Sequence, residues 1–285
     1  MDRFINFNKP TDMTSHDAVN IIRKIFQTKK VGHAGTLDPL ATGILPIAIN
    51  RATKFIEYIA DCDKTYRAEI FFGMSTDSGD MSGKIITQTE NFFMPTISDI
   101  QAVTKNFIGE ITQTPSKFSA IKINGRKAYE LSRKNISFDM PSRVIKINRI
   151  NILRVDKNIV TAEIDCGKGT YIRTLAEDIG KAFNIPTTLK SLCRVRVGNF
   201  ILDNSATIED LKKSPEKFCM SVEDCLNFRK FYLPEHRLKA FRNGLSTTVR
   251  ADNEIVSVYI GEKFLGVGKI FNNELRSAKL IDTEI

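Results

Sequence analysis

Apolar residues recur along the chain with two spacings, and each spacing predicts one kind of element. Short runs of alternating or β-branched apolar residues predict strands over residues 4–8, 65–72, 143–165 and 189–200, the third run being a hairpin that turns at Asp156-Lys-Asn158. Apolar residues three or four positions apart predict helices over residues 15–29, 51–60, 96–107 and 170–183. Residues that can cap a helix stand near three of these starts, namely Ser15, Thr96 or Ser98, and Thr170.

Residues 31–43 interrupt this pattern, because they show no period and are rich in residues that break helices and strands. Gly32, Gly35 and Gly43 allow sharp turns there without bulky neighbours. Packed elements flank the segment on both sides, which is how functional loops are usually held. The segment is therefore predicted to be a loop that carries function.

The pattern changes after Pro234, where a short predicted helix is followed by short strands separated by Asn-Gly, Asp-Asn and Gly-Glu turns. We expect residues 1–230 to form one domain and residues 231–285 a small β-rich domain. Hairpin signals outnumber strand–helix–strand units along the chain. The predicted fold class is therefore α+β, with a mixed and largely antiparallel sheet in the larger domain.

Composition places this chain of 285 residues among ordinary globular proteins, at 42% hydrophobic and 26% charged residues. No apolar run approaches the roughly 18 residues of a membrane span, and the N-terminus lacks the pattern of a signal peptide. The five cysteines form no CxxC pair, and their odd number does not suggest a disulfide framework. We expect no membrane association and a location in the reducing cytoplasm.

Positive charge is concentrated in one segment of the chain. The formal net charge is +9, and residues 117–154 contain ten Lys or Arg residues against Glu130 and Asp139 alone. Such a basic block is typical of a surface that binds a phosphate backbone. The alternative interpretation is a solvated surface that acidic groups elsewhere in the fold balance.

Missing motifs exclude several kinds of catalytic site. Neither the phosphate-binding pattern GxxxxGKS/T nor a GxGxxG after a strand occurs, and no GxSxG marks a nucleophilic serine. The three histidines, His16, His33 and His236, lie far apart, and no carboxylates have the spacing of metal ligands. An enzyme with this sequence is expected to need neither a metal nor a cofactor.

Asp38 is the strongest remaining candidate for chemistry. It precedes Pro39, which favours an extended backbone, and it lies in the glycine-rich loop. Its carboxylate is thereby predicted to be held at the floor of a cleft. Taken alone, an Asp-Pro pair is more often a turn or a helix cap, and His33 alone is more often a packed or surface histidine.

At this loop the sequence resembles a known family. Gly32-His-Ala-Gly-Thr-Leu-Asp-Pro-Leu-Ala-Thr-Gly43, followed by Ala52-Thr-Lys54, closely resembles the signature of the bacterial tRNA pseudouridine(55) synthases of the TruB type. Further similar motifs are spread over residues 1–200: Asn8-Lys-Pro10, Lys64-Thr-Tyr-Arg-Ala68, Ser119-Ala-Ile-Lys-Ile-Asn-Gly-Arg126, Gly167-Lys-Gly-Thr-Tyr-Ile-Arg-Thr174 and Leu192–Gly198. Residues 231–285 resemble the family's small PUA-like RNA-binding domain only in their position in the chain and in their pattern of short strands and turns.

The resemblance implies that uridine 55 in the T loop of tRNA is isomerised to pseudouridine. The glycosidic N1–C1′ bond breaks, the base rotates, and C5 joins C1′, so no cofactor is consumed. Asp38 matches the family's nucleophile, which must be ionised, Arg173 matches the arginine that pairs with it, and Tyr66 matches the aromatic that stacks on the base and assists proton removal. Without the resemblance, Arg173 would be taken as solvated and Tyr66 as a core residue of a strand.

Other matched residues are implied to bind the substrate. Tyr171 and Leu192 match residues that line the uridine pocket, although either alone would be taken as core. His33 matches a residue that holds the T loop after the target base has left the stack, a step that costs a few kcal/mol. Lys9 would support the catalytic loop or contact the RNA backbone. The basic block would contact phosphates around the T stem and loop, with tRNA as the partner and the chain as a monomer that requires no protein partner.

Two positions depart from the family's pattern. The family usually has two prolines and a tyrosine just before SAxK, whereas Ser116 and Phe118 occupy two of these places here. We expect these changes to affect contacts with RNA but no catalytic group. Three alternatives to this function are an RNA-binding or tRNA-folding module with secondary or no activity, a pseudouridine synthase for ribosomal RNA, and a metal-free nucleosidase that uses Asp38.

Overall fold

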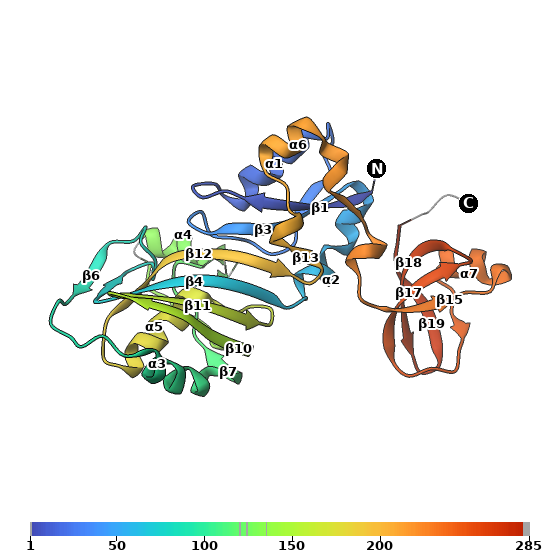
Figure 1. Cartoon of the computed structure of the whole chain (residues 1–285). Coiled ribbons are helices and arrows are strands. Elements are labelled where there is room, and N and C mark those ends of the chain that lie inside the picture. The colour runs from blue at the N-terminus through green and yellow to red at the C-terminus, as the bar shows by residue number, and fades with distance from the viewer. Residues whose placement is uncertain (1, 120, 124, 135, 282–285) are drawn as a thin grey trace.

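The computed structural model describes residues 2–119, 121–123, 125–134 and 136–281. The strands of its main sheet are β1 (Arg3–Lys9), β2 (Val31–His33), β3 (Thr42–Ile49), β4 (Lys64–Phe72), β7 (Gly109–Gln113), β10 (Arg143–Asp156), β11 (Ile159–Cys166), β12 (Thr187–Val197), β13 (Phe200–Ile201) and β14 (Cys219–Ser221). They lie in the order β14-β1-β3-β12-β4-β11-β10-β7, with β13 beside β12 and β2 beside β3 (Figure 1). The expected hairpin is present as β10 and β11, which turn at residues 157–158.

The main sheet is mixed and largely antiparallel, as predicted. Its described pairings are antiparallel with the exception of β3 and β12, which run parallel over Thr42–Gly43 and Cys193–Arg194. The α+β fold class is therefore confirmed. The single parallel contact matters for the site, because it sets the end of the predicted functional loop against the middle of β12.

Short helices pack around the sheet. They are α1 (Ser15–Ile25), η1 (Asn50–Phe55), α2 (Ile56–Ala60), α3 (Ile97–Thr104), η2 (Lys105–Phe107), α5 (Ile172–Ala182), η3 (Leu202–Asn204), α6 (Ile208–Lys213), η4 (Pro215–Phe218) and η5 (Glu223–Cys225). Helices α3 and α5 cover one face of the sheet near β10, β4 and β12 (Figure 1). Buried residues of these helices and strands, among them Ile100, Ile147, Ile164 and Leu175, form the larger hydrophobic core.

Two of the predicted helix caps are wrong by one residue. Thr14, not Ser15, caps α1, and its hydroxyl and the Asp17 carboxylate form a complete capping box. The Ser15 hydroxyl is free for another partner and bonds the backbone of Leu37 instead. Helix α5 begins at Ile172 rather than at Thr170, whose hydroxyl donates to the carbonyl of Gly167. Of the two predicted caps for α3, Thr96 is the one used.

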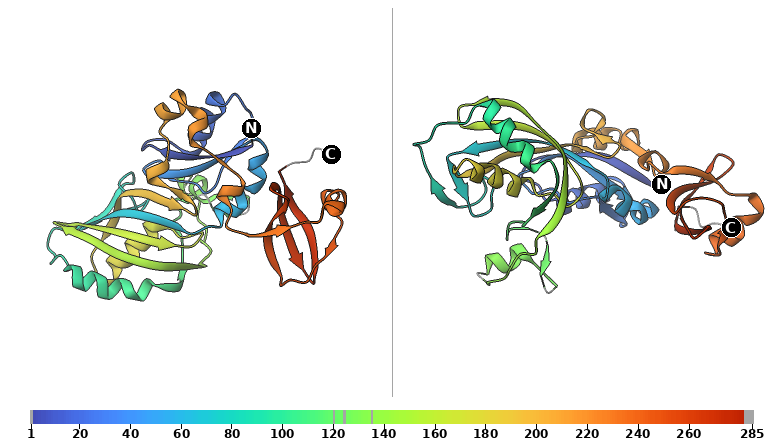
Figure 2. Two further views of the ribbon diagram at one scale, coloured as in Figure 1. Left: turned by 45° about the vertical axis from the view of Figure 1, so that its right-hand side comes forward. Right: turned by 90° about the horizontal axis from the view of Figure 1, so that it is seen from below.

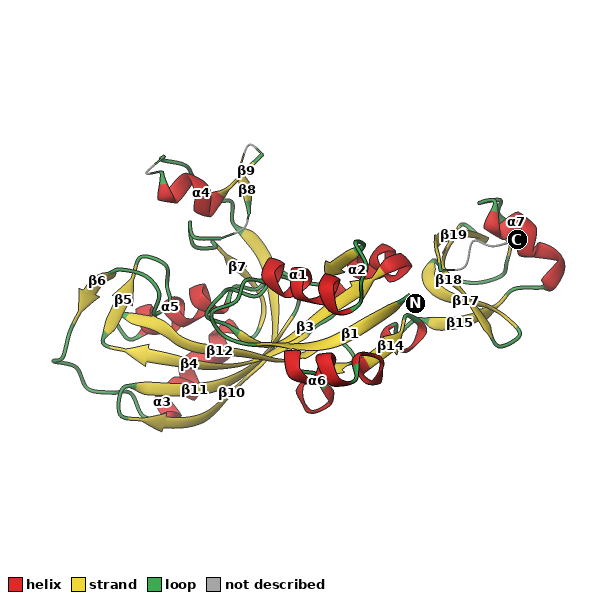
Figure 3. Cartoon of the chain, turned by 90° about the horizontal axis from the view of Figure 1, so that it is seen from above, coloured by secondary structure: helices red, strands yellow, loops and turns green. Residues whose placement is uncertain are grey.

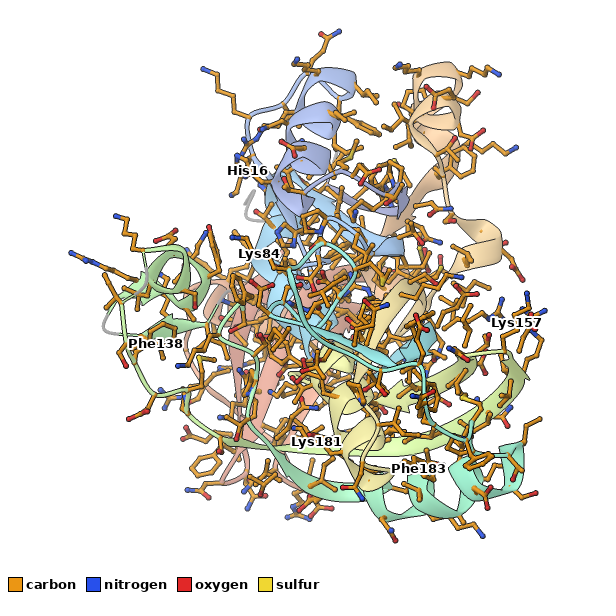
Figure 4. All side chains as sticks on the ribbon, turned by 90° about the vertical axis from the view of Figure 1, so that its left-hand side faces the viewer. His16, Lys84, Phe138, Lys157, Lys181 and Phe183 are labelled. Carbon is orange, nitrogen blue, oxygen red and sulfur yellow. The ribbon has the colours of Figure 1, made fainter. Side chains whose placement is uncertain are left out.

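Residues 114–142 form an insertion between the neighbouring strands β7 and β10, which we call the arm. It contains β8 (Lys122–Ile123), β9 (Arg126–Lys127) and α4 (Ala128–Arg133), and it stands out from the sheet (Figure 3). In Figure 4 the arm, which carries Phe138, lies at the opposite side of the molecule from Lys157 at the tip of the β10–β11 hairpin. Ala120 and Asn124 of the motif at residues 119–126 lie outside the described residues. A second hairpin, β5 (Met74–Thr76) and β6 (Ile85–Gln88), follows β4.

The C-terminal part has a sheet and a core of its own (Figure 2). Its elements are β15 (Arg229–Tyr232), η6 (Glu235–Arg237), α7 (Leu238–Arg242), β16 (Thr247–Thr248), β17 (Glu254–Ile260), β18 (Lys263–Phe271) and β19 (Glu274–Leu280), with the strand order β15-β17-β18-β19-β16. Strand β15 spans the predicted domain boundary at residue 230, and the division of the chain at that residue stays a prediction. Throughout the described ranges, no helix is long and apolar enough to cross a membrane.

Candidate active site

One row of the main sheet brings together the segments that carry the candidate site. Arg194 of β12 is paired with Gly43 of β3 on one side and with Tyr66 of β4 on the other. The loop of residues 34–41 leads directly into β3, so the parallel pairing of β3 with β12 holds that loop beside the middle of the sheet. Residues distant in sequence therefore meet at this row.

A cleft of about 330 Å³ opens beside this row, a volume typical of sites for small molecules. Its lining comes from the loop, from β4 and β12, from residues 167–173, which lead into α5, and from Ala60 of α2 and Ile121 of the insertion between β7 and β10. Five of the residues predicted from the sequence share this lining: Asp38, Tyr66, Tyr171, Arg173 and Leu192.

Asp38 and Arg173 form an ion pair at the cleft. Arg173 Nε lies 3.0 Å from Asp38 Oδ2, and the two side chains are exposed to very different degrees, 42% for Asp38 and 6% for Arg173. The arginine is thus a buried anchor, and the carboxylate that it orients remains open to a ligand. An ion pair at this distance orients the carboxylate toward the guanidinium.

The remaining donors of Arg173 are also engaged. Nη1 donates to the carbonyl of Ser78 at 2.7 Å and lies 3.6 Å from the buried carboxylate of Asp80. Nη2 donates to the carbonyl of Phe118 in the arm at 3.0 Å. A guanidinium bound along three directions cannot rotate freely, so the geometry of the pair with Asp38 is set by the fold.

Contacts on either side of Asp38 hold its loop. The Ser15 hydroxyl donates to the carbonyl of Leu37 at 3.0 Å and accepts from the amide of Leu37 at 2.9 Å. The ammonium of Lys9 donates to the carbonyl of Pro39 at 3.3 Å, and also to two carbonyls near its own position in the chain. The residues immediately before and after Asp38 are therefore both tied to the N-terminal segment.

Glycine plays two roles in this loop. Gly35 and Gly43 have positive φ angles of 90° and 97°, as expected for sharp turns. Gly32 does not turn the chain, contrary to the prediction, because it lies within β2. It is needed for close packing instead, since a Cβ there would stand 2.7 Å from the side chain of Ile56.

Tyr66 lies on β4 with its side chain largely buried beside the cleft. Burial raises the pKa of its phenol, while the neighbouring positive charge of Arg194 acts in the opposite direction. Arg194 is fully buried, and it donates to the carbonyl of Ile44 at 2.8 Å and to that of Gly35 at 3.0 Å. Arg194 therefore holds the loop in place through these two hydrogen bonds and also lies beside Tyr66.

His33 and Lys9 lie near the cleft but are not part of its described lining. Burial lowers the pKa of His33, and Arg194 adds to this effect, so the imidazole is neutral at physiological pH. Burial also lowers the pKa of Lys9 to about 8. The structure places Lys9 under the loop, in contact with Pro39, rather than on a surface that faces a ligand.

The sequence did not single out four residues that the structure brings to the site: Lys64, Asp80, Gln113 and Arg194. Lys64 and Arg194 line the cleft and lie within the recognised motifs at residues 64–68 and 192–198. Asp80 belongs to an Asp-Ser-Gly-Asp turn, whose only sequence signal is turn chemistry. Gln113 bonds the backbone of Tyr171 and has no local signal at all.

The structure divides the basic block of residues 117–154 into two parts. On β10, Arg149 is paired with Glu163 and Asp165, and Arg154 with Asp156. In the arm, by contrast, Lys122, Arg126 and Lys127 are exposed, as are Lys117 and Lys134. The arm therefore presents a cluster of exposed positive charge, and Lys146 of β10 is exposed as well.

The arrangement suits chemistry at one electron-poor carbon. It offers a partly exposed carboxylate paired with an arginine, a neighbouring aromatic ring and an apolar wall from Leu192. In the part of the chain that the structure describes, no group of three or more His, Cys, Asp or Glu side chains could hold a metal ion. A carboxylate so placed is suited to nucleophilic attack.

Comparison with known proteins gives a consistent result. Residues 23–172 match the family model described as TruB family pseudouridylate synthase, N-terminal domain. The chain is 36% identical to the tRNA pseudouridine synthase B of Clostridium tetani, over 99% of this chain and 100% of that protein. It is 39% identical to the enzyme of the same name from Carboxydothermus hydrogenoformans, over 98% of each. It is 46% identical to the tRNA pseudouridine synthase B of Mycobacteroides abscessus, over 72% of this chain and 70% of that protein.

Two solved structures share the fold. One is an H/ACA RNP bound to a substrate RNA containing 2′-deoxyuridine, with a TM-score of 0.76 and 21% identity over 98% of this chain and 85% of that one. The other is a Cbf5-Nop10-Gar1 complex, with a TM-score of 0.73 and 24% identity over 94% and 78% of the two chains. At these identities the similarity shows a shared fold, which includes the C-terminal part of the chain.

Proposed function

Because the chain belongs to the TruB family of pseudouridylate synthases, we propose that it isomerises uridine 55 in the T loop of tRNA to pseudouridine. The observation that carries this proposal is the Asp38–Arg173 pair, which opens onto a cleft shared with Tyr66, Tyr171 and Leu192. The tRNA pseudouridine synthases B that resemble the chain over almost its full length support tRNA as the substrate.

Asp38 is proposed to act on the ribose of the target uridine. Its carboxylate, oriented by Arg173, either attacks C1′ or promotes departure of the base through a glycal-like species, and both routes require the ionised form. The N1–C1′ bond breaks, the uracil rotates, and a C5–C1′ bond forms. One proton leaves C5 and one is taken up at N1, so the product has the composition of the substrate and no cofactor is needed.

The other cleft residues are proposed to bind the flipped base. Tyr66 stacks on it and assists removal of the proton from C5, while Tyr171 and Leu192 close the pocket around it. Extrusion of a base costs a few kcal/mol, which such contacts must offset. His33 is proposed to hold the T loop beside the cleft, and Lys9 to support the catalytic loop through Pro39.

The exposed cations of the arm are proposed to contact phosphates around the T stem and loop. Ser116 and Phe118, which depart from the family's pattern, lie at the base of this arm, so we expect them to alter its contacts with RNA. Residues 231–285 are proposed to act as a small PUA-like RNA-binding domain. The chain is proposed to act on tRNA as a monomer in the cytoplasm, without a protein partner.

The test is tritium release from a tRNA transcript that contains 5-tritiated uridine. The wild-type protein should release the tritium of one uridine per tRNA molecule. A transcript with cytidine at position 55 should release none. Asp38→Asn should abolish release while it leaves tRNA binding within about twofold, because the substitution removes the nucleophile and keeps the shape of the side chain. Asp203→Asn, at an exposed position outside the cleft, is the matched control.

Other outcomes separate the alternatives. Release only from ribosomal RNA transcripts would replace tRNA as the substrate, and formation of free uracil would indicate a nucleosidase. A folded wild-type protein that binds tRNA and releases no tritium would contradict the proposed activity and leave an RNA-binding module.

A further inference from the structure

The two ends of the arm meet at one residue pair. Gln113 is the last residue of β7 and Arg143 is the first residue of β10, and the two are paired in the sheet. The next residues outward, Thr114 and Ser142, share a hydrogen bond between their hydroxyls at 2.7 Å. The arm therefore leaves and re-enters the sheet through a closed neck, which we define as Gln113 and Arg143.

Both neck residues hold Tyr171. The carboxamide of Gln113 donates through Nε2 to the carbonyl of Tyr171 at 3.0 Å, and its Oε1 accepts from the amide of Tyr171 at 2.8 Å. Gln113 itself is only 1% exposed. The guanidinium of Arg143 lies over the ring of Tyr171, 5.1 Å from its centroid. One neck residue thus fixes the backbone of Tyr171 while the other covers its ring.

These contacts lead directly to the catalytic pair. Tyr171 is the N-cap residue of α5, and Gln113 supplies the acceptor for its amide, which has no partner within the helix. Arg173 lies in the first turn of the same helix. The arm also touches Arg173 itself, because the carbonyl of Phe118 accepts from Nη2. Contacts from the neck and from the arm therefore converge on the arginine that orients Asp38.

We propose that Gln113 is a positioning residue for the isomerisation, which acts through Tyr171 on the arginine that pairs with Asp38. This inference rests on the function proposed above. The carboxamide bonds two groups of the same residue, so it fixes the orientation of Tyr171 as well as its distance. The neck thereby sets the first turn of α5, in which Arg173 lies. A misplacement of about 1 Å in a catalytic site can lower the rate by two orders of magnitude.

The test separates rate from binding. Gln113→Glu keeps the shape of the side chain but turns an oxygen toward the carbonyl of Tyr171, and Gln113→Met removes both hydrogen bonds without adding charge. For each variant we expect the single-turnover rate at saturating tRNA to fall at least about tenfold, with the dissociation constant for tRNA within about twofold. Gln101→Glu, at an exposed position of α3, is the matched control and should keep the wild-type rate.

A second measurement does not depend on activity. The amide of Tyr171 should exchange with solvent at least about tenfold faster in Gln113→Met than in wild type, while the amide of Ile179, deeper in α5, should not change. Unchanged exchange at Tyr171, or a wild-type rate in either Gln113 variant, overturns the inference. If both Gln113 variants fail to fold, Arg143→Lys decides, because it keeps the charge and loses the planar group over Tyr171. A rate lowered at least about threefold supports the positioning of Tyr171 by the neck, and a wild-type rate overturns it.

The two proposals fail in different ways. If the wild-type protein makes no pseudouridine, the proposed function fails, and the exchange experiment still tests whether Gln113 positions Tyr171. If the wild-type protein is active and the Gln113 variants are equally active, the function stands and the positioning role fails.

Discussion

Buried cations hold the loop that carries Asp38. Lys9 and Arg194 are both fully buried, and their N–H groups donate to backbone carbonyls, including those of Pro39 and Gly35 in the loop. A buried cation is costly unless its donors are satisfied, so each of these residues requires the loop to stay where its carbonyls can accept. The position of Asp38 is thus linked to the free energy of folding, and a displaced loop would leave charged donors without partners.

Lys9 makes the free energy of unfolding depend on pH in a specific window. Its pKa is about 8 in the folded protein, below the usual value of 10.5, because it is buried. At a pH between these two pKa values, Lys9 binds a proton more often in the unfolded chain than in the folded protein. A rise in pH through this range therefore favours the folded state. Relative to Lys9→Met, the wild-type protein should gain on the order of 1–2 kcal/mol of unfolding free energy between pH 7.5 and 9.5.

Urea unfolding of both proteins at the two pH values measures this difference. The cysteines and tyrosines that also titrate in this range are common to both proteins and cancel in the comparison. The same change with pH in both proteins would show that Lys9 is not responsible.

Single residues of the site were predictable where they belong to a motif and not where their partners are distant. Asp38, Tyr66 and Arg173 stand in short recognisable segments, and the structure brings all three to one cleft. Asp80 and Gln113 reach Arg173 and Tyr171 across 93 and 58 positions of the chain. Nothing in the local sequence of either residue specifies such a partner, because the contact exists only after the sheet has formed.

At the scale of elements, hydrophobic spacing predicted the longer strands β1, β4, β10, β11 and β12 and the helices α1, α2, α3 and α5. It did not predict β2, β3, β7 and β14 of the main sheet, nor which strands are neighbours. The β10–β11 hairpin follows from its turn residues, and β4 from its β-branched and aromatic run. No such signal predicted the parallel contact between β3 and β12, because more than 130 residues lie between these two strands in the sequence. That contact is what carries the loop to Tyr66, so the part of the fold hardest to predict is the part that builds the site.

Gly43 marks this contact and gives a sharp prediction. It has φ +97°, and a Cβ added there would lie 2.3 Å from the carbonyl oxygen of Arg194. Gly109 has nearly the same φ, +100°, with nothing within 4 Å of an added Cβ. Both alanine substitutions bear the strain of a positive φ, about 1 kcal/mol, and only Gly43→Ala also forces β3 away from β12.

We expect Gly43→Ala to lower the free energy of unfolding by at least about 2 kcal/mol more than Gly109→Ala does. Chemical denaturation of the two variants and the wild-type protein measures this. Equal losses would mean that β3 and β12 can separate slightly at no cost, and that the close approach is not required for the fold.

At the scale of the whole molecule, two structures stand out from the main sheet at separate places, the arm and the C-terminal sheet (Figures 2 and 3). The C-terminal sheet is docked by Phe264 against Phe55 and by the ion pair of Lys279 with Glu57. Among the described residues, the arm joins the sheet at its neck and contacts the rest of the chain through the hydrogen bond of Phe118 with Arg173. The arm is thus the element that carries exposed positive charge next to the cleft.

This charge distribution predicts how affinity for tRNA responds to salt. Each phosphate contact releases counterions, and the slope of log affinity against log salt concentration changes by somewhat less than one per contact. Replacing Lys122, Arg126 and Lys127 of the arm by Gln should therefore make the slope shallower by about 2 and weaken binding most at low salt. The matched control replaces Lys105, Lys157 and Lys213, three exposed lysines outside the arm, and should leave the slope unchanged. Titration of labelled tRNA from 50 to 300 mM salt measures the slope for both triple variants. An equal change of slope in the two variants would mean that tRNA binding depends on net charge alone. A wild-type affinity that does not depend on salt would exclude the arm as the phosphate-binding surface.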